Sequence, residues 1–442
     1  MAFNTLPGFR EFYPEECSVR EYLFSTWRQT AKSFNFHEFD APVLEPLELF
    51  TVKSGDEIVG QLFNFEDKGG RAIALRPEMT PSLARLVGAK ANSMRKPVKW
   101  FNVGEHFRYE RPQKGRLRSF YQFNADILGE ESTIADAEAI TLLIQILSNF
   151  GLTDKEFCIR LSDRDIWVYY LIACGLSDED AHSVLTIIDK MEREDEDKVL
   201  EQLKGFFGGK AAEFLKNIKQ LAQLRSIVDI EHFFNTVSLA EEKEAIHARI
   251  ASWRELLGQL DAFGVSRFIR IDLSIVRGLA YYTGFVFEAF QTVGQGRALA
   301  GGGRYDNLVK KLANVDMPAV GFAMGDVTLL DLLKQQDLVP ACHETPDVFV
   351  VIDSEAERDI AFKDILMLRA LGIRVDFSYK NQNISKQLKQ ANQLEAKLAL
   401  VYGATEVARN EVLLKDLDKR TEENISRDEL IEAVSNKLAH LV

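Results

Sequence analysis

Closely spaced cysteines and histidines, the usual ligands of structural metals, are missing from this chain. Its seven histidines show no HxxxH spacing, and no CxxC pair occurs among its four cysteines, Cys17, Cys158, Cys174 and Cys342. A structural zinc site normally takes its ligands from such pairs. The sequence therefore predicts no structural zinc, and cysteines this scattered are typical of a reducing compartment. We expect a cytoplasmic protein.

Long apolar runs are also missing. No stretch approaches the roughly eighteen consecutive apolar residues that a membrane-spanning helix needs. The first residues, MAFNTLPGFREFYPEE, do not combine a basic segment with an apolar one, as a secretory signal does. We therefore expect neither secretion nor a membrane among the partners.

An excess of positive charge is the third missing feature. The 54 basic side chains are outnumbered by 67 acidic ones, which gives a net charge of -13. Nonspecific coating of nucleic acids depends on distributed cations and is disfavoured by this balance. One short segment reverses the sign, because it holds Arg108, Arg111, Lys114, Arg116 and Arg118. Such a segment can still bind RNA or a polyphosphate locally.

What the chain does have is enough apolar material for more than one core. Its 442 residues are 46% hydrophobic, and single cores stop growing at about 250–300 residues. Helical periodicity over 18–34 precedes an extended segment near 41–44, and hairpin patterns follow over 61–75 and 98–129. These patterns predict an antiparallel sheet.

The pattern changes between 165 and 263, where helix formers and charges dominate. Strand patterns return over 268–271 and 284–290, and a glycine-rich block at 300–306 precedes a helix near 327–334. We therefore predict one domain, 1–333, that is interrupted by a helical insertion at 165–263.

A polar linker at 334–346 separates this domain from a second one at 347–442. The expected elements of the second domain are a strand at 347–353, a helix at 355–371, a strand at 373–377, a helix at 383–394, a strand at 397–402 and a last helix after Arg427. This alternation is typical of a small α/β domain with crossover connections.

The basic segment lies between two strand patterns and reads FRYERPQKGRLRSF over residues 107–120. Guanidinium groups bind phosphate oxygens in pairs and keep their charge at any relevant pH, so a long basic loop is suited to a polyphosphate. The alternative interpretation is a solvated surface hairpin. Charge alone does not decide between the two.

Several motifs carry a resemblance to one family. FRYERPQKGRLRSFYQF resembles the second signature motif of class II aminoacyl-tRNA synthetases, in the form peculiar to histidyl-tRNA synthetases. VRGLAYYTG at 276–284, GGGRYDNL at 301–308 and LRPEMT at 75–80 are similar to histidine-specific motifs of that family. The segment around Pro42 is similar to the first class II motif, which in the family belongs to the dimer interface.

The resemblance implies an α+β fold. It predicts an antiparallel-sheet class II catalytic domain at 1–333 with the helical insertion, followed by a C-terminal α/β anticodon-binding domain at 347–442. The implied activity is activation of histidine with ATP and its transfer to the 3′ end of tRNA(His). The implied partners are histidine, ATP, tRNA(His) and a second copy of the chain in a homodimer.

For ATP, the resemblance makes Arg108 the ligand of the α-phosphate and places Glu110, Arg116 and Phe120 around the nucleotide, with Phe120 stacked on adenine. It makes Arg277 a second catalytic cation; a surface salt bridge is the alternative, but Arg277 lies inside an apolar run. Cations fixed at the α-phosphate stabilise the charge that develops as a carboxylate attacks it. Mg²⁺ is expected between the phosphates, although the sequence identifies neither its ligands nor a general base.

For histidine, the matching positions are Glu78, Thr80, Gln122, Asp126, Arg277, Tyr281 and Tyr282. Glu78 would meet the α-ammonium group, while Asp126 and Tyr282 would contact the ring. A buried carboxylate is costly without a partner, so such a site should reject ligands that lack the ring N–H. The alternative for the two tyrosines is a pair of strand aromatics, one inward and one outward, which suits Tyr281 better than Tyr282.

The sequence departs from the family pattern in its third motif. Thr328 occupies the position of the arginine that contacts the ATP γ-phosphate in the family, and neutral threonine cannot replace that charge. Arg304 and Arg116 are the candidate substitutes. Ala280 replaces an aspartate and Met79 a glycine of the family motifs, and Asp126 stands where many bacterial members have glutamate.

Two other functions remain open beside the synthetase. One is a synthetase-like regulatory subunit of histidine biosynthesis, and the other is a paralogue that binds histidine or tRNA without catalysis. Regulatory subunits generally lack the C-terminal domain and residues of the Arg108 or Arg277 type, all of which occur here. In the C-terminal domain, Lys380, Lys386, Lys389 and Lys397 predict a modest basic face for phosphate contacts.

Overall fold

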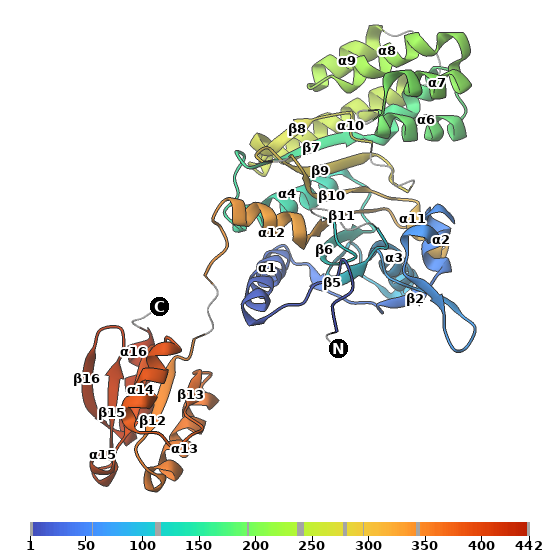
Figure 1. Cartoon of the computed structure of the whole chain (residues 1–442). Coiled ribbons are helices and arrows are strands. Elements are labelled where there is room, and N and C mark those ends of the chain that lie inside the picture. Colours follow the sequence, from blue (N-terminus) through green and yellow to red (C-terminus); the bar gives the residue numbers. More distant parts are fainter. Residues whose placement is uncertain are drawn as a thin grey trace. The chain divides into compact units, whose positions relative to one another are not determined.

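The structure is a computed structural model of the chain, which falls into two compact units, Met1–Pro340 and Ala341–Val442 (Figure 1). The residues it describes are 3–54, 56–110, 116–191, 194–236, 243–276, 281–294, 296–341 and 345–439, without the side chains of 52–58. Across these ranges, no helix combines the length and the apolar character needed to cross a bilayer.

The first unit is built on an eight-stranded sheet. Its strands, in spatial order, are β1 (His37–Glu38), β5 (Val98–Phe107), β6 (Ser119–Leu128), β11 (Ala319–Gly325), β10 (Ala298–Arg304), β9 (Phe285–Gln291), β7 (Phe157–Asp163) and β8 (Ile269–Ile271). The inner pairs are antiparallel, and only the outermost pairs, β1 with β5 and β7 with β8, are parallel. The predicted antiparallel sheet is confirmed.

Two long helices, α1 (Pro14–Ser33) and α4 (Thr133–Asn149), pack together against one face of this sheet. Helix α1 begins with a proline and two acidic residues, which suit the first turn. Its buried residues Leu23, Trp27 and Ala31 recur every four positions and meet Phe101 and Phe123 of the sheet. The other face of the strands is thereby left for a site.

A small antiparallel sheet lies beside the large one. Its strands are β2 (Leu44–Pro46), β4 (Ala72–Leu75) and β3 (Asn64–Glu66), and its helices are α2 (Glu48–Ser54), the 3₁₀ helix η1 (Asp56–Gln61) and α3 (Thr80–Gly88). Buried Glu45 accepts a hydrogen bond from Ser82 at 3.0 Å and pairs with Arg85 at 2.6 Å. These contacts fix the start of α3, whose first residue, Thr80, lines a cavity.

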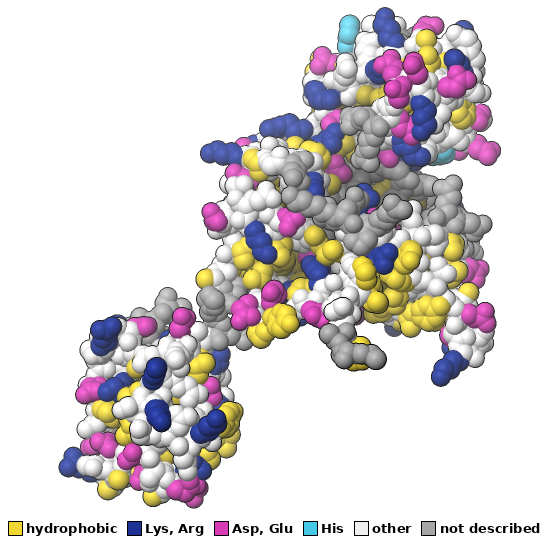
Figure 2. All heavy atoms as spheres, in the orientation of Figure 1, with side chains coloured by type: hydrophobic (Ala, Val, Ile, Leu, Met, Phe, Trp, Pro, Cys, Tyr) yellow, Lys and Arg dark blue, Asp and Glu magenta, His cyan; other side chains and the backbone are white. Residues whose placement is uncertain are grey.

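The described helices between β7 and β8 form the region at the top of Figure 1. They are α5 (Arg164–Ala173), α6 (Asp178–Lys190), α7 (Glu196–Phe207), α8 (Ala211–Ala222), α9 (Ile227–Thr236) and α10 (Lys243–Ala262). Asp163, Ser177 and Asp195 cap the first three of them with side-chain oxygens. Acidic and basic side chains are intermixed on the face of this region that Figure 2 presents. The helical insertion predicted by the sequence pattern is confirmed.

The remaining helices of the first unit are α11 (Leu308–Ala313) and α12 (Asp326–Gln335), with short 3₁₀ helices η2 (Ala91–Ser93), η3 (Gly208–Lys210) and η4 (Ser266–Phe268). The glycine-rich block at 300–306 is mostly strand, since β10 runs through Gly301, Gly302 and Gly303. A side-chain Cβ at Gly302 would lie 2.3 Å from the carbonyl oxygen of Gly321. The glycines therefore permit close pairing of β10 with β11.

The second unit is a five-stranded sheet in the order β13 (Val375–Phe377), β12 (Val348–Ile352), β14 (Leu398–Tyr402), β15 (Glu411–Asp416) and β16 (Thr421–Ser426). Helices α13 (Glu355–Ala370) and α14 (Ile384–Gln393) connect its three parallel strands. The unit also contains α15 (Ala404–Ala408), η5 (Arg427–Glu429) and α16 (Leu430–Ala439). The predicted α/β domain with crossovers is confirmed, but the antiparallel pair β15 and β16 was not predicted.

Candidate active site

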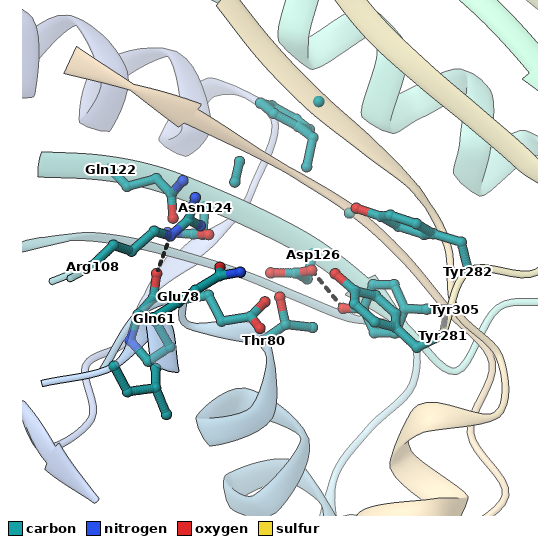
Figure 3. Close-up of a pocket in the computed structure, with 16 residues that line it drawn as sticks. Gln61, Glu78, Thr80, Arg108, Gln122, Asn124, Asp126, Tyr281, Tyr282 and Tyr305 are labelled. Carbon is teal, nitrogen blue, oxygen red and sulfur yellow. Dashed lines mark hydrogen bonds between the residues drawn. The ribbon is translucent and has the colours of Figure 1, made fainter. Parts of the chain in front are cut away.

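A cavity of about 360 Å³ opens above the free face of the large sheet, where β6, β10 and β11 meet the turn before α3 (Figure 3). Its lining residues are Gln61, Leu62, Pro77, Glu78, Thr80, Arg108, Gln122, Asn124, Asp126, Tyr281, Tyr282, Gly301, Tyr305, Gly321, Phe322 and Ala323. The structure thus brings together Glu78, Thr80, Gln122, Asp126, Tyr281 and Tyr282, which the sequence predicted as one binding site. That these residues bind one ligand stays a prediction.

Strand β6 supplies the polar wall of this cavity. Successive side chains of a strand point to opposite faces, so Gln122, Asn124 and Asp126 face the cavity while Phe123 and Ala125 enter the core. The amide oxygen of Gln122 and the amide nitrogen of Asn124 are buried and have no hydrogen-bond partner among the described residues. Because buried polar atoms normally have partners, these two atoms can bind a polar ligand. Asn124 was missed by sequence reasoning, although the alternation along β6 could have identified it.

Asp126 is held in place from two sides. The hydroxyl of Tyr305 donates a hydrogen bond to its Oδ1 at 2.5 Å, and both side chains are buried. Gly321 lies opposite on β11, where a Cβ would come within 1.9 Å of the same oxygen. Burial and the charge of Asp126 raise the pKa of Tyr305 well above its ordinary value, so this hydroxyl stays protonated. Sequence reasoning missed Tyr305, even though it lies within the quoted GGGRYDNL motif.

The two tyrosines at 281 and 282 both line the cavity, and neither belongs to a strand. Their rings contact each other at a centroid distance of 4.6 Å, and Tyr281 also meets the edge of Tyr305 at 5.9 Å. Burial, followed by the nearby Tyr282 and Glu78, raises the pKa of Tyr281 well above its ordinary value. The alternative of one inward and one outward strand aromatic is therefore wrong.

Glu78 and Thr80 reach the cavity from the turn between β4 and α3. This turn is anchored by buried Arg76, which donates to the carbonyl oxygen of Glu105 at 2.9 Å, to that of Ala41 at 2.8 Å and to Asp40 at 2.9 Å. One side chain thus ties the turn to β5 and to the segment before β2. Glu78 faces the same cavity as Asp126 (Figure 3).

A second cavity of about 260 Å³ adjoins the first and shares Arg108, Gln122, Gly301 and Ala323 with it. Its remaining lining residues are Glu110, Arg116, Leu117, Phe120, Ala298, Leu299, Ala300, Gly325, Asp326, Val327 and Thr328. The predicted nucleotide residues Arg108, Glu110, Arg116 and Phe120 therefore lie together. Arg108 stands at the junction, where it donates to the carbonyl oxygen of Pro77 at 3.2 Å and lies over the ring of Phe120 at 5.3 Å.

The rim of the second cavity and the residue beneath Phe120 differ in exposure. On the rim, Arg116 is 62% exposed and pairs with Glu110 at 3.2 Å. Buried His106 does not line the cavity but stacks on Phe120, which does, at a centroid distance of 6.1 Å, and it hydrogen-bonds the carbonyl oxygen of Gly104. Burial, together with the charges of Arg76 and Arg108, lowers the pKa of His106 to about 3. The imidazole is therefore neutral at physiological pH and adds no charge to the cavity.

The structure separates the two cations that could replace the third-motif arginine. Thr328 lines the second cavity, and Arg116 lines it too. Arg304 does not, because its buried guanidinium pairs with Asp136 and Asp306 and donates to the carbonyl oxygens of Glu130 and Ser132. Arg304 is a structural residue, and the expectation that it substitutes for the missing arginine is wrong.

Arg277 belongs to the segment 277–280, which lies outside the described residues. Among the residues that are described, no group of three histidine, cysteine or carboxylate side chains is arranged to hold a metal ion. Two carboxylates line the second cavity. Asp326 pairs with Arg10 at 2.8 Å and accepts from the backbone N–H of Tyr121 at 3.0 Å, whereas the carboxylate of Glu110 lies at the rim and pairs with Arg116.

In the second unit, a polar groove runs along α14. It is lined by Ser378, Tyr379, Lys380, Gln382, Lys386, Lys389, Gln390 and Gln393. Tyr379 is 84% exposed, so its ring is free to stack on a planar ligand. Three of the four predicted lysines lie here. The fourth, Lys397, instead pairs with Asp347 at 3.2 Å and does not line the groove.

Comparison with known proteins gives the same division of the chain. The family described as Histidyl-tRNA synthetase matches residues 8–329, and the family described as Anticodon binding domain matches residues 347–437. The curated histidine–tRNA ligase of Opitutus terrae is 51% identical over 97% of both chains. That of Pyrococcus horikoshii is 35% identical over 98% of both chains.

Solved structures share the fold. The histidyl-tRNA synthetase of a Nostoc species superposes with a TM-score of 0.77 at 24% identity, covering 99% of this chain and 100% of that one. A protein of Bacillus halodurans, described as an ATP phosphoribosyltransferase regulatory subunit/histidyl-tRNA synthetase, gives a TM-score of 0.72 at 22% identity over 91% of this chain and 100% of that one. Sequence and fold together show that the chain belongs to the histidyl-tRNA synthetase family.

Proposed function

We propose that this protein is a catalytically active histidine–tRNA ligase. It joins histidine to ATP as histidyl-adenylate, releases pyrophosphate, and transfers the histidyl group to the 3′ end of tRNA(His). The observation that carries the proposal is the pair of adjoining cavities, one lined by Glu78, Asp126 and Tyr282 and the other by Arg108 and Phe120. Such a pair can hold an amino acid and a nucleotide with their reacting groups at the junction.

The first cavity suits histidine in particular. Asp126, fixed by Tyr305, offers a carboxylate to a ring N–H, and Glu78 offers a second carboxylate to the α-ammonium group. Tyr282 completes the ring site, and the amide oxygen of Gln122 and the amide nitrogen of Asn124, which have no partner among the described residues, can bind the remaining polar atoms. A ligand without a ring N–H would place no donor against the buried carboxylate of Asp126, which is the physical basis of its rejection.

The reacting groups meet at Arg108. The histidine carboxylate attacks the α-phosphorus, and pyrophosphate leaves, so negative charge grows on the α-phosphate oxygens. The guanidinium of Arg108 binds that charge at the junction of the cavities, and Arg277 is proposed as the second cation. The ring of Phe120 lies 5.3 Å from the guanidinium of Arg108 and is proposed to stack on adenine.

Magnesium is proposed to enter with ATP. Mg²⁺ keeps several waters and is held mainly by substrate phosphates with one or two carboxylates. The second cavity fits that mode, because Asp326 is engaged by Arg10 and, among the described lining residues, Glu110 offers a carboxylate at the rim. Glu110 would then help to hold Mg²⁺, which would supply positive charge to the pyrophosphate leaving group.

Transfer to tRNA needs no protein base in this proposal, because a phosphate oxygen of the adenylate can accept the proton of the tRNA hydroxyl. The anticodon-binding domain is proposed to contact tRNA through the groove of Lys380, Lys386, Lys389 and Tyr379. Lysines bind phosphates without reading sequence, while an exposed aromatic ring stacks on a base.

Further parts of the proposal concern organisation. We place the catalytic domain at 1–333 with its insertion at 165–263, the linker at 334–346 and the anticodon-binding domain at 347–442. We also propose a cytoplasmic homodimer. The dimer is supported by β2, an edge strand whose Leu44 and preceding Val43 are 45% and 41% exposed.

One alternative has a specific observation in its favour. A paralogue that binds histidine or tRNA without catalysis would explain why Thr328, a neutral residue, lines the nucleotide cavity. A regulatory subunit has less support, because Arg108 keeps its place at the junction and the anticodon-binding domain is present.

The experiment that tests the proposal is ATP–pyrophosphate exchange by the purified protein with each amino acid in turn. We expect exchange with histidine alone, and a loss of at least about a hundredfold in Arg277→Ala, as removal of one transition-state donor gives elsewhere. If folded protein binds histidine but gives no exchange, the proposal of an active ligase is wrong. The non-catalytic paralogue that binds histidine or tRNA would then be favoured.

A further inference from the structure

Helix α5, the first helix of the insertion, begins at Arg164, one residue before the boundary predicted at 165. Arg164 contacts the chain on both sides of Tyr281 and Tyr282, which line the histidine site. The backbone N–H of Arg164 donates to the carbonyl oxygen of Gly284 at 2.8 Å, and its side-chain Nη1 donates to that of Val276 at 3.2 Å. These two carbonyls flank the run that carries Tyr281 and Tyr282. One residue of the insertion therefore fixes the chain on both sides of two cavity-lining tyrosines.

A second residue of α5 supports the same run. The indole N–H of buried Trp167 donates to the carbonyl oxygen of Leu273 at 2.9 Å. On the far side, the backbone N–H of Thr283 donates to the carbonyl oxygen of Arg304 at 2.8 Å. Helix α5 thus binds Leu273, Val276 and Gly284, while β10 binds Thr283.

The helix that carries Arg164 is itself firmly held. Asp163 caps α5 by accepting from the backbone N–H groups of Asp165 and Ile166. Its other oxygen pairs with Arg249 of α10, the last helix of the insertion, at 2.5 Å. Asp163 is fully buried, so this link between the first and last helices is shielded from solvent.

The guanidinium of Arg164 lies between the insertion and the cavity. It is 5% exposed, and burial lowers its pKa, which the charges of Asp189, Asp165 and Tyr282 partly restore. Asp189 belongs to α6, and Tyr282 lines the histidine cavity. Helices α5 and α6 pack in one core that includes Trp167, Leu171 and Val184, so they hold the guanidinium as a unit.

We propose that Arg164 is a positioning residue for histidine activation: its contacts with Val276 and Gly284 set the position of Tyr282 relative to the substrate, and so couple the helical insertion to the histidine site. Arg164 does not line either cavity. It acts through the backbone of Val276 and Gly284 and through its position next to Tyr282. The inference rests on the proposed function, since it concerns the same site.

The test uses the full-length protein with three substitutions. Arg164→Met removes the side-chain donor but keeps the backbone bond to Gly284, and Arg164→Lys keeps a positive charge that cannot reproduce the fork of a guanidinium. Arg254→Met is the matched control, because Arg254 is an arginine of the same insertion that is 53% exposed and pairs only with Glu231 among the described residues. Counting active sites by the burst of adenylate formation corrects each rate for unfolded protein.

We expect Arg164→Met to lower the per-site exchange rate about tenfold and to raise the KM for histidine, with the KM for ATP unchanged. This corresponds to the loss of one hydrogen bond from a charged donor. Arg164→Lys should recover part of that loss, and it replaces Arg164→Met as the test if the methionine variant does not fold. Arg254→Met should match the wild type in all three constants.

Two results would count against the inference, and they differ. If the wild type exchanges pyrophosphate with histidine but Arg164→Met and Arg164→Lys match Arg254→Met per active site, the coupling through Arg164 is wrong while the proposed function stands. If the wild type itself shows no exchange with histidine, the proposed function fails and the inference fails with it.

Discussion

The two adjoining cavities of this protein are built in different ways. The cavity proposed for histidine relies on buried contacts such as the hydrogen bond from Tyr305 to Asp126, and a glycine opposite makes room for the carboxylate. The cavity proposed for ATP has an exposed rim, where Arg116 and Glu110 form a solvent-accessible pair, and its Phe120 stacks on buried His106.

The difference suggests how the protein divides selectivity from binding. Buried hydrogen bonds are costly to leave unmade, so a cavity built from them rejects wrong ligands strongly. Exposed ion pairs contribute little by themselves and can rearrange around a polyphosphate. Changes in the first cavity should therefore affect histidine use steeply, and changes at the rim of the second should affect ATP use mildly.

The largest effect is expected from Asp126→Asn. The substitution keeps the size of the side chain but removes the charge that accepts the ring N–H, so kcat/KM for histidine should fall about a thousandfold in pyrophosphate exchange. The KM for ATP should stay within a factor of about two. Asp154→Asn, at an exposed carboxylate, is the control. Equal losses for histidine and ATP would break the division between the cavities.

A smaller effect on the same cavity is expected from Tyr305→Phe. Only the hydroxyl that orients Asp126 is lost, and a hydrogen bond to a charged group contributes about 1.5–3 kcal/mol, which corresponds to roughly ten- to a hundredfold in kcat/KM for histidine. The same assay measures it. Combined with Asp126→Asn, the two losses should not add, because they affect one interaction. Full additivity would show that Tyr305 acts independently of Asp126.

At the rim, Arg116→Ala should raise the KM for ATP by about three- to tenfold and leave the KM for histidine unchanged. An exposed arginine can still contact phosphate, but solvent screens it. Raising the salt concentration should shrink the difference between this variant and the wild type. A loss as large as that of Asp126→Asn would mean that Arg116 carries the full role of the arginine absent at Thr328.

Substitution of buried His106 should change the stability of the fold and leave the selectivity for histidine unchanged. In the folded protein the pKa of His106 is about 3, below its ordinary value of 6.5, so the unfolded chain binds the proton first. Above pH 6.5 the imidazole is neutral in both states and costs no stability. As pH falls from 6.5 toward 3, protonation of His106 in the unfolded chain lowers the free energy of unfolding by up to about 1.4 kcal/mol per pH unit. Urea unfolding of His106→Gln between pH 7 and pH 5 should therefore show a shallower loss of stability than the wild type. Parallel curves would contradict the assignment of a neutral buried imidazole.

Elements with clear periodicity could be predicted from the sequence, and elements of small or charged residues could not. The hairpin of β5 and β6 was predicted because two runs rich in strand-forming residues flank a polar, basic loop. Strand β16 reads TEENIS and is mostly exposed, so no apolar alternation marks it. Strand β10 was interpreted only as a glycine-rich block, because glycines do not indicate a strand. The structure shows that these glycines permit the close approach of β11.

The site was predicted through motifs, and its gaps have physical causes. Glu78, which lies inside the LRPEMT motif, and Asp126, which follows the basic motif by three residues, line the same cavity. Arg304 was one of two candidates to replace the arginine missing at Thr328, but its buried pairing with Asp136 gives it a structural role. Arg164 belongs to no motif, and its contacts with Val276 and Gly284 join segments more than a hundred residues apart in the chain.

Calorimetric titration of the purified protein with histidine in the absence of ATP tests the central claim most directly. The account predicts that histidine binds, that thienylalanine, which has a ring of similar size without an N–H, does not bind measurably at the same concentration, and that Asp126→Asn removes the preference. Equal affinities for histidine and thienylalanine in the wild type would contradict a cavity organised around Asp126 for the imidazole ring.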